Sequence, residues 1–205
     1  MNVGADVRLG QLETNLVRLR SMSGFLGDRY VMVNIPAAQI EAVENGRVVL
    51  RHTAIVGKID RQTPILNSKI NEIIVNPYWN APESIVRKDI IPLMRKDPTY
   101  LTRNNIHILD TKSGQEIDPT TIDWNTEEAA NYRFRQDPGK INAMASTKIN
   151  FHNEFATYMH DTPQQGLFNK LSRFESSGCV RCQNIRDLTT WILRDTPGWD
   201  RQHME

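Results

Sequence analysis

Two side chains near the end of the chain, His160 and Cys179, could together carry out acyl transfer. A thiolate is the nucleophilic form of cysteine, and a histidine within hydrogen-bond reach can generate it and later protonate a leaving amine. Gly178 permits a close backbone approach, so the amides of Ser177, Gly178 and Cys179 could point at a developing oxyanion. Arg181 could hold a substrate carboxylate through two parallel hydrogen bonds.

The same residue types also have a purely structural interpretation. In that interpretation Cys179 is a small buried residue, His160 caps a strand end and Arg181 is a surface charge. Lone cysteines and histidines are common in such places, so residue types alone favour the structural interpretation. The wider sequence pattern must decide between the two.

Composition narrows the class of protein. The chain has 205 residues, of which 39% are apolar and 24% charged, as expected for one main globular domain. The formal net charge of +1 provides no field that would attract nucleic acid. No stretch approaches the roughly 18 to 20 apolar residues that cross a bilayer, and Met1 to Leu9 lacks the apolar segment of a signal peptide. We therefore expect neither nucleic-acid binding nor a transmembrane segment.

The elements that must position these residues are mainly strands. Apolar residues at three- and four-residue steps predict one helix from Ala5 to Met22, and a break with two glycines follows at 21–28. A second helix is predicted from Ser84 to Met94. Residues rich in β-formers, with an Asn-Gly hairpin signal at 45–46, predict strands at 30–35, 39–44, 47–55, 72–75, 106–109, 148–151 and 155–159. The predicted fold class is mainly β (α+β).

The order of residues around the cysteine resembles the catalytic motif of the L,D-transpeptidases, the YkuD-like cysteine enzymes that cross-link bacterial peptidoglycan. The motif begins with His160-Asp161-Thr162-Pro163; after His160, 15 residues precede Ser176-Ser177-Gly178-Cys179-Val180-Arg181. Ser177 is a departure, since most members have histidine there. The large periplasmic branch with a capping insertion often has Ser-Ser-Gly-Cys, and this chain resembles that branch.

The resemblance extends over nearly the whole chain. Further segments that look like the family are Gly27 to Pro36, Val56-Gly57-Lys58 with Arg61-Gln62-Thr63-Pro64, Asn76 to Asn80 and Phe134 to Gly139. It implies a β-sandwich with an inserted capping subdomain and an N-terminal helix. The implied division is a connecting helix at 1–24 and a catalytic domain at 25–205, with the capping insertion at about 83–132.

The resemblance also implies a reaction. Cys179 would attack a stem tetrapeptide, release D-Ala and leave a thioester, which the amine of a second stem would resolve to a 3-3 cross-link. His160 would act as base and acid, oriented by the backbone carbonyl of Asp161. The acceptor could instead be a wall-anchored protein, or water in an L,D-carboxypeptidase. The family needs no metal or organic cofactor, its members react with carbapenems, and this branch lies in the periplasm of Gram-negative bacteria.

Three other residues have two interpretations each. Trp79 either lines the substrate groove or anchors its proline-rich loop. Tyr158 either contacts substrate or is a core residue, and strand alternation favours the core. Cys182 is either a small buried side chain, which its surroundings favour, or one half of a redox latch with Cys179. The scattered histidines lack the spacing of a zinc site, so no metal is expected.

Two other classes of function compete with the transpeptidase. The pair Cys179 and Cys182 has the CxxC spacing of a thiol-disulfide oxidoreductase, although such folds place the pair at a helix N-terminus within a βαβ frame. The other alternative is a non-catalytic wall-binding module. The intact set of His160, Gly178, Cys179 and Arg181 argues against lost chemistry.

Overall fold

The computed structural model describes residues 3–24 and 26–202 of the chain. It is mainly β with several short helices, and an N-terminal helix is present, which confirms the predicted fold class. The larger sheet has eight strands: β1 (Arg29–Asn34), β2 (Gln39–Glu44), β3 (Arg47–Gly57), β4 (Ile70–Val75), β9 (Thr147–Phe151), β10 (Met159–His160), β11 (Phe174–Ser176) and β12 (Val180–Cys182). The predicted strands are found, except that the one expected at 155–159 is reduced to β10.

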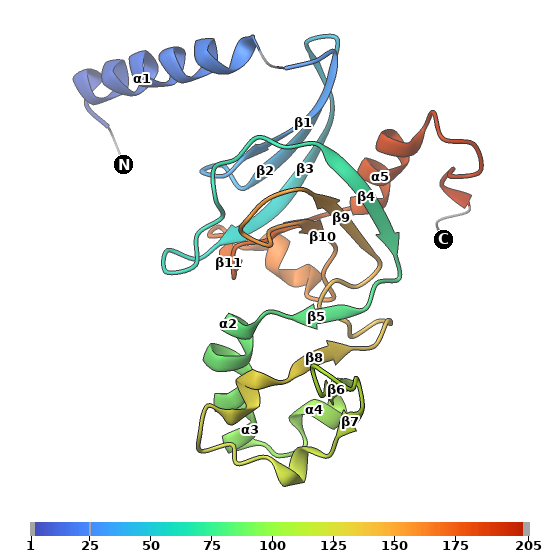
Figure 1. Cartoon of the computed structure of the whole chain (residues 1–205). Coiled ribbons are helices and arrows are strands. Elements are labelled where there is room, and N and C mark those ends of the chain that lie inside the picture. Colours follow the sequence, from blue (N-terminus) through green and yellow to red (C-terminus); the bar gives the residue numbers. More distant parts are fainter. Residues whose placement is uncertain (1–2, 25, 203–205) are drawn as a thin grey trace.

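Strand β3 is common to all parts of this sheet. The strand order is β1-β2-β3-β12-β10-β9-β4, and β11 pairs with the end of β3. The first part of β3 pairs with β2, whereas Ala54 and Ile55 pair with Cys182 and Arg181 of β12. The sandwich expected from the resemblance is therefore one hydrogen-bonded path of strands in which β3 belongs to both halves (Figure 1).

The main core lies between the two halves of this path and helix α5 (Ile185–Leu193). Its fully buried members come from β2, β3, β9, β10, β12 and α5; they include Ile40, Val56, Ile149, Met159, Val180, Cys182 and Leu188. Burying a Val, Leu, Ile or Met side chain contributes about 1.5 to 3 kcal/mol. The core therefore fixes the strands that carry the residues of interest.

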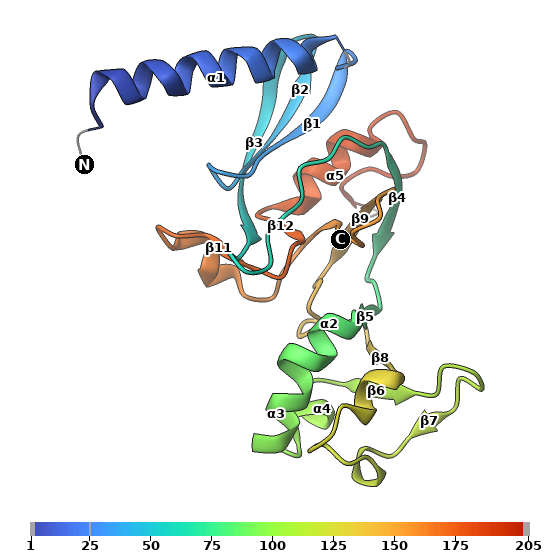
Figure 2. The ribbon, with the colours of Figure 1, turned by 60° about the vertical axis from the view of Figure 1, so that its left-hand side comes forward.

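A second sheet, with its own core, lies at the far end of the molecule from α1 (Figures 1 and 2). Its strand order is β5-β8-β6-β7, from β5 (Trp79–Ala81), β6 (Ile106–Leu109), β7 (Glu116–Ile117) and β8 (Arg133–Gln136). Helical segments cover it: α2 (Glu83–Ile85), η1 (Val86–Ile90), α3 (Ile91–Lys96), α4 (Tyr100–Arg103), η2 (Pro119–Thr121) and η3 (Glu128–Asn131). Phe134, Ile90, Ile108 and Leu101 are buried in its separate cluster.

The predicted helix at 84–94 is present, with an irregular middle. Segments α2, η1 and α3 follow one another without a gap, and η1 is a π-helical turn in which the Ile91 amide donates to the Val86 carbonyl. Pro92, at the start of α3, has no amide hydrogen with which to continue the regular hydrogen-bond pattern of the helix. Asp89 lies in this wide turn.

Helix α1 (Ala5–Ser23) confirms the helix predicted at the N-terminus. Its apolar side chains do not pack on the sheets, because Val7, Leu9, Leu12, Leu16, Val17 and Leu19 are 48% to 68% exposed. Figure 1 shows α1 projecting from the top of the sheet. Among residues 3–24 and 26–202, no helix has both the length and the apolar content to cross a membrane.

The segment after β3 runs without helix or strand from Lys58 to Lys69, and Gly57 determines how tightly it turns. The Gly57 amide donates to Thr63 Oγ1 at 2.9 Å. A Cβ atom at Gly57 would lie 2.2 Å from the Arg61 carbonyl oxygen and 2.5 Å from the Thr63 nitrogen. Both are backbone atoms, so only glycine lets this segment fold back on the strand end.

We predict that Gly57→Ala lowers the free energy of unfolding by about 2 to 3 kcal/mol, because the added methyl group must displace backbone. Urea denaturation of the two proteins measures this difference. Gly166 in η4 (Gln165–Asn169) is the matched control, since a Cβ there meets nothing within 4 Å. Gly166→Ala should leave stability unchanged or raise it by up to about 1 kcal/mol. Equal stability of the two variants would contradict the close approach at Gly57.

Candidate active site

Three adjacent strands present alternate residues to opposite faces, and one row of these residues belongs to the core. Met159 of β10 is paired with Ile149 of β9 and with Val180 of β12. All three side chains are buried in the main core. We call this set the core row.

The next residues along the same strands form a row on the other face. His160 pairs with Lys148 of β9 and with Arg181 of β12. Because successive residues of a strand point to opposite faces, these three side chains, the site row, lie together away from the core. Tyr158 and Cys179 immediately precede β10 and β12, and they extend the same face by one residue. The register thus brings His160 and Cys179, far apart in sequence, onto neighbouring strands.

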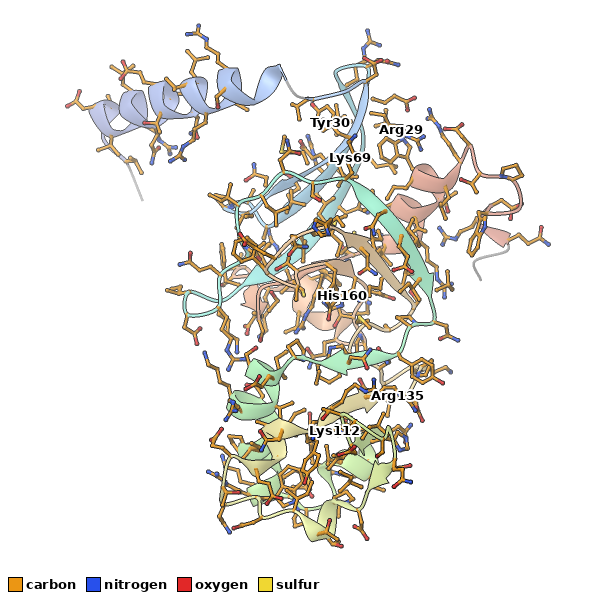
Figure 3. The ribbon with its side chains drawn as sticks, viewed as in Figure 1. Arg29, Tyr30, Lys69, Lys112, Arg135 and His160 are labelled. Atoms are coloured by element: carbon orange, nitrogen blue, oxygen red, sulfur yellow. The ribbon has the colours of Figure 1, made fainter. Side chains whose placement is uncertain are left out.

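His160 is held as a neutral base. Its Nδ1 lies 2.5 Å from the Asp161 carbonyl oxygen. A carbonyl can only accept, so Nδ1 carries the proton and Nε2 keeps a free lone pair. Burial lowers the pKa of His160 to about 3, and the positive charges of Arg181 and Lys148 add to the effect. Figure 3 labels His160 near the middle of the molecule, between the larger sheet and β5.

The Asp161 side chain is turned away from the imidazole. Its carboxylate accepts hydrogen bonds from the Ser146 hydroxyl at 2.5 Å and from the Thr162 amide at 2.8 Å. The carboxylate therefore holds the loop, and the contact with His160 is made by the Asp161 carbonyl, as the resemblance implied.

Cys179 is partly covered and lies against Tyr158. Burial raises the pKa of the Cys179 thiol; hydrogen bonds from the Tyr158 amide and hydroxyl and the charges of Lys148 and Arg181 oppose this. The resting pair is therefore a thiol beside a neutral imidazole. Groups that favour the thiolate are already in place around the sulfur.

Tyr158 links this site to the second sheet. Burial raises the pKa of Tyr158, whereas a hydrogen bond from the Trp79 indole acts in the opposite direction. The Tyr158 ring also lies 5.5 Å from the His160 ring, centroid to centroid. Tyr158 thus lies outside the buried cluster, so its interpretation as a core residue is wrong. Trp79, from β5, packs on the second cluster and reaches Tyr158 as well.

The loop before the nucleophile is held by Ser176. The Ser176 hydroxyl donates to the Cys179 carbonyl at 2.5 Å and accepts from the Gly178 amide at 3.2 Å. Gly178 has φ +115°, a backbone conformation that side chains disfavour. Of the three amides expected to face an oxyanion, that of Gly178 therefore already has a partner, whereas Ser177 lies exposed at the tip of the loop.

Arg61 is a site residue to which sequence analysis gave no role. Its guanidinium donates to both carboxylate oxygens of Asp89, at 2.5 and 3.1 Å, and to the Ser177 hydroxyl at 2.9 Å. The hydrogen bond to Asp89 raises the pKa of Arg61. The Arg61 side chain thus connects the loop after β3 to two other segments: the wide helical turn that covers the second sheet, through Asp89, and the loop before Cys179, through Ser177.

Arg181, the expected anion anchor, has one partner and one free donor. Its Nη1 donates to the Gln164 side-chain oxygen at 2.9 Å. Its buried Nε has no hydrogen-bond partner among the described residues. This Nε is shielded from solvent, so an acceptor could reach it only if the surrounding side chains moved.

Cys182 lies on the core face of β12, the face opposite Cys179. It is completely buried and belongs to the main core, and both cysteines are free thiols. A bridge between them would require β12 to unfold. The structure thus agrees with the small buried side chain and gives no support to the redox latch.

A cysteine, a neutral histidine oriented by a carbonyl and a glycine-backed loop define the class of cysteine acyltransferases. Residues 28–199 match the model of the YkuD family, the L,D-transpeptidase catalytic domain. The chain belongs to this family.

A curated relative from Haemophilus influenzae, provisionally named an L,D-transpeptidase, is 38% identical over 190 residues. The match covers 92% of this chain and 38% of the relative, so the chain spans well under half of that protein's length. A solved structure of an Ldtfm-avibactam carbamoyl enzyme aligns with a TM-score of 0.40 at 11% identity, covering 76% of this chain and 41% of the other.

We predict that Asp89→Asn destabilises the protein by about 1 to 2 kcal/mol, because it removes a charged partner from the Arg61 guanidinium, which is only 16% exposed. Hydrogen exchange should increase in 58–69 and in 83–96. Asp60→Asn is the matched control: Asp60 is 72% exposed and lies 3.9 Å from Arg61. Its effect should stay below about 0.5 kcal/mol. Equal effects of both variants would show that Asp89 does not hold the loop.

Proposed function

We propose that this chain is the catalytic part of an L,D-transpeptidase that acts on peptidoglycan stem tetrapeptides. The observation that supports this most is the neutral His160, whose Nδ1 donates to the Asp161 carbonyl. His160 lies on β10, and Cys179 directly precedes the neighbouring strand β12. Membership of the family supplies the reaction class.

In the first step, Nε2 of His160 takes the thiol proton as Cys179 Sγ attacks the carbonyl between diaminopimelate and the terminal D-Ala. The new oxyanion is bound by backbone amides of the loop Ser177, Gly178 and Cys179; the Gly178 amide exchanges its bond to Ser176 for this purpose. His160 then returns the proton to the leaving nitrogen. The C–N bond breaks, D-Ala departs and a thioester remains on Cys179.

In the second step, an acceptor amine attacks the thioester and gives its proton to His160. The C–S bond breaks, an amide forms and the thiol is restored. A stem-peptide amine gives a 3-3 cross-link, the amine of a wall-anchored protein gives an attachment, and water gives a carboxypeptidase. We favour the stem peptide, and product analysis distinguishes the three.

Substrate is held by Arg181, whose charge on the site row suits a carboxylate, and by Trp79 and Tyr158, which border the site from two sheets. We further propose that residues at about 83–132 form a cap over the site. The separate core of that region and the Arg61–Asp89 contact support this. In this proposal, residues 1–24 are a connecting helix and 25–205 the catalytic domain.

The cellular role follows from the reaction. Family members are associated with the cell wall, and we propose that this chain works in the periplasm of a Gram-negative bacterium, in wall biogenesis and cell shape. Its partners are then stem peptides as donor and acceptor, with carbapenems as covalent inhibitors. No cofactor enters the proposed steps.

A thiol-disulfide oxidoreductase is not favoured. Its two cysteines would have to reach each other, whereas Cys182 is buried on the opposite face of β12 from Cys179. The two cysteines also lie at the two ends of strand β12 and not at the N-terminus of a helix.

We predict that incubation with a carbapenem adds the full mass of the drug to the protein, because opening of the β-lactam ring by a thiolate releases nothing. Intact-protein mass spectrometry measures the adduct. Cys179→Ala is the control and should stay unmodified. With a tetrapeptide donor and acceptor, wild-type protein should release D-Ala and form a dimer. Absence of any Cys179-dependent adduct and of D-Ala release would overturn the proposal.

We predict that Cys182→Ala keeps carbapenem acylation of Cys179 within about twofold of wild type, because the two side chains lie on opposite faces of β12. The smaller side chain should lower the free energy of unfolding by about 1 kcal/mol. An oxidoreductase would instead lose its activity in this variant. Rates of adduct formation and disulfide reduction, measured on both proteins, separate these outcomes.

A further inference from the structure

Lys148 is a cation of the site row without a matching anion. It lies directly beside His160 in the register of β9 and β10. Its ammonium is 4.2 Å from the centre of the Tyr158 ring. Within the described part of the chain, it makes no salt bridge, and the nearby Glu72 instead accepts a hydrogen bond from Asn150 at 2.6 Å. The ammonium therefore points to the site face over the Tyr158 ring, where it makes no ion pair, although the charges of Cys179 and Glu72 favour its protonated form.

A shallow hollow opens beside this ammonium. Its walls come from β4, β9 and the loop before β10; they include Asn71, Lys148, Asn150, Asn153, Thr157 and Tyr158. Of the described residues that line it, none is acidic, and Lys148 is the only lysine or arginine. Amide and hydroxyl groups can donate hydrogen bonds to an anion. The Asn150 and Asn153 amides already donate to Glu72 and to backbone carbonyls, so the Lys148 ammonium is the main donor that this hollow offers to an anion.

The burial of the Lys148 ammonium also favours an anionic ligand. A half-buried ammonium without a counter-ion is costly, and burial lowers the pKa of Lys148. An anion bound beside it would recover this cost. Arg181, on the opposite side of His160, already donates to Gln164, so the two cations of the site row are not equivalent.

We propose that the hollow beside Tyr158 is a carboxylate-binding site in which Lys148 pairs with a free carboxylate of the peptide substrate. This inference rests on the proposed function for the identity of the substrate, since stem peptides carry several free carboxylates. Lys148 is then a specificity-determining residue that selects an acidic peptide next to the nucleophile.

A first experiment needs no peptide substrate. Cys179 is alkylated with iodoacetate, which carries a carboxylate, and with the neutral iodoacetamide, and the two rates are followed by mass spectrometry at pH 8. Any effect of Lys148 on the reactivity of the thiol is shared by both reagents, so it cancels in their ratio. Lys148→Met should lower the ratio of iodoacetate to iodoacetamide rates by about three- to tenfold. An unchanged ratio overturns the proposal.

A second experiment identifies the carboxylate. Tetrapeptide donors are prepared with each free carboxylate converted in turn to an amide, and D-Ala release is measured. Lys148→Met should reduce kcat/KM for the unmodified donor by about ten- to a hundredfold, mainly through KM. It should have no effect on the one donor whose bound carboxylate has been removed. An equal loss with every donor would assign Lys148 to the nucleophile or to folding and overturn the proposal.

Three controls keep the outcomes distinct. Lys148→Arg should retain most of the preference for iodoacetate, because the charge remains. Lys148→Gln replaces Lys148→Met if the apolar variant is unstable. Lys69→Met removes an exposed lysine that Figure 3 labels well away from His160, and it should change neither measurement. If wild-type protein releases no D-Ala, the proposed function fails, and the alkylation ratio still decides whether the carboxylate site exists.

Discussion

The alternation of side chains along β10 and β12 is the constraint on which the rest of the site depends. One face supplies the core row, Ile149, Met159 and Val180, and the other supplies the site row. Burial of the core row contributes several kcal/mol, at about 1.5 to 3 kcal/mol for each side chain. A slip of one residue would exchange the faces and place cations in the core, so the packing that stabilises the fold also fixes the positions of Cys179 and His160.

The same arrangement explains the resting state of the site. The imidazole lies between two permanent cations, and burial removes water from it, so both effects favour the uncharged ring. The thiol is likewise uncharged at rest, although the Tyr158 hydroxyl and the two cations are positioned to stabilise negative charge on sulfur. The surroundings of Cys179 are therefore arranged for charge that develops during attack, and they need little rearrangement at that moment.

Local patterns in the sequence predicted much of this structure, and contacts between distant segments account for what was missed. The strands at 39–44 and 106–109 and helix α1 follow from local sequence patterns, and the resemblance to the L,D-transpeptidases pointed to His160 and Cys179. No spacing connects Arg61 to Asp89 and Ser177, because the tertiary fold alone brings them together. Sequence alone leaves Tyr158 between a substrate contact and a core residue, and the register places it on the face of His160. Exposure of the apolar side chains of α1 also could not be predicted, since amphipathic spacing specifies a helix and not its neighbours.

The central position of β3 has a consequence for the order of folding. The chain from Arg29 to Gly57 can form hairpins early, because β1, β2 and β3 pair with their neighbours in sequence. The nucleophile loop meets its partners much later, since Arg61 and Ser177 are 116 residues apart and the loop between them must first be closed. A growing chain can therefore pair β1, β2 and β3 before the main core and the loop that holds Cys179 are complete. Cys179 therefore gains its folded surroundings only when the last third of the chain has paired with β3.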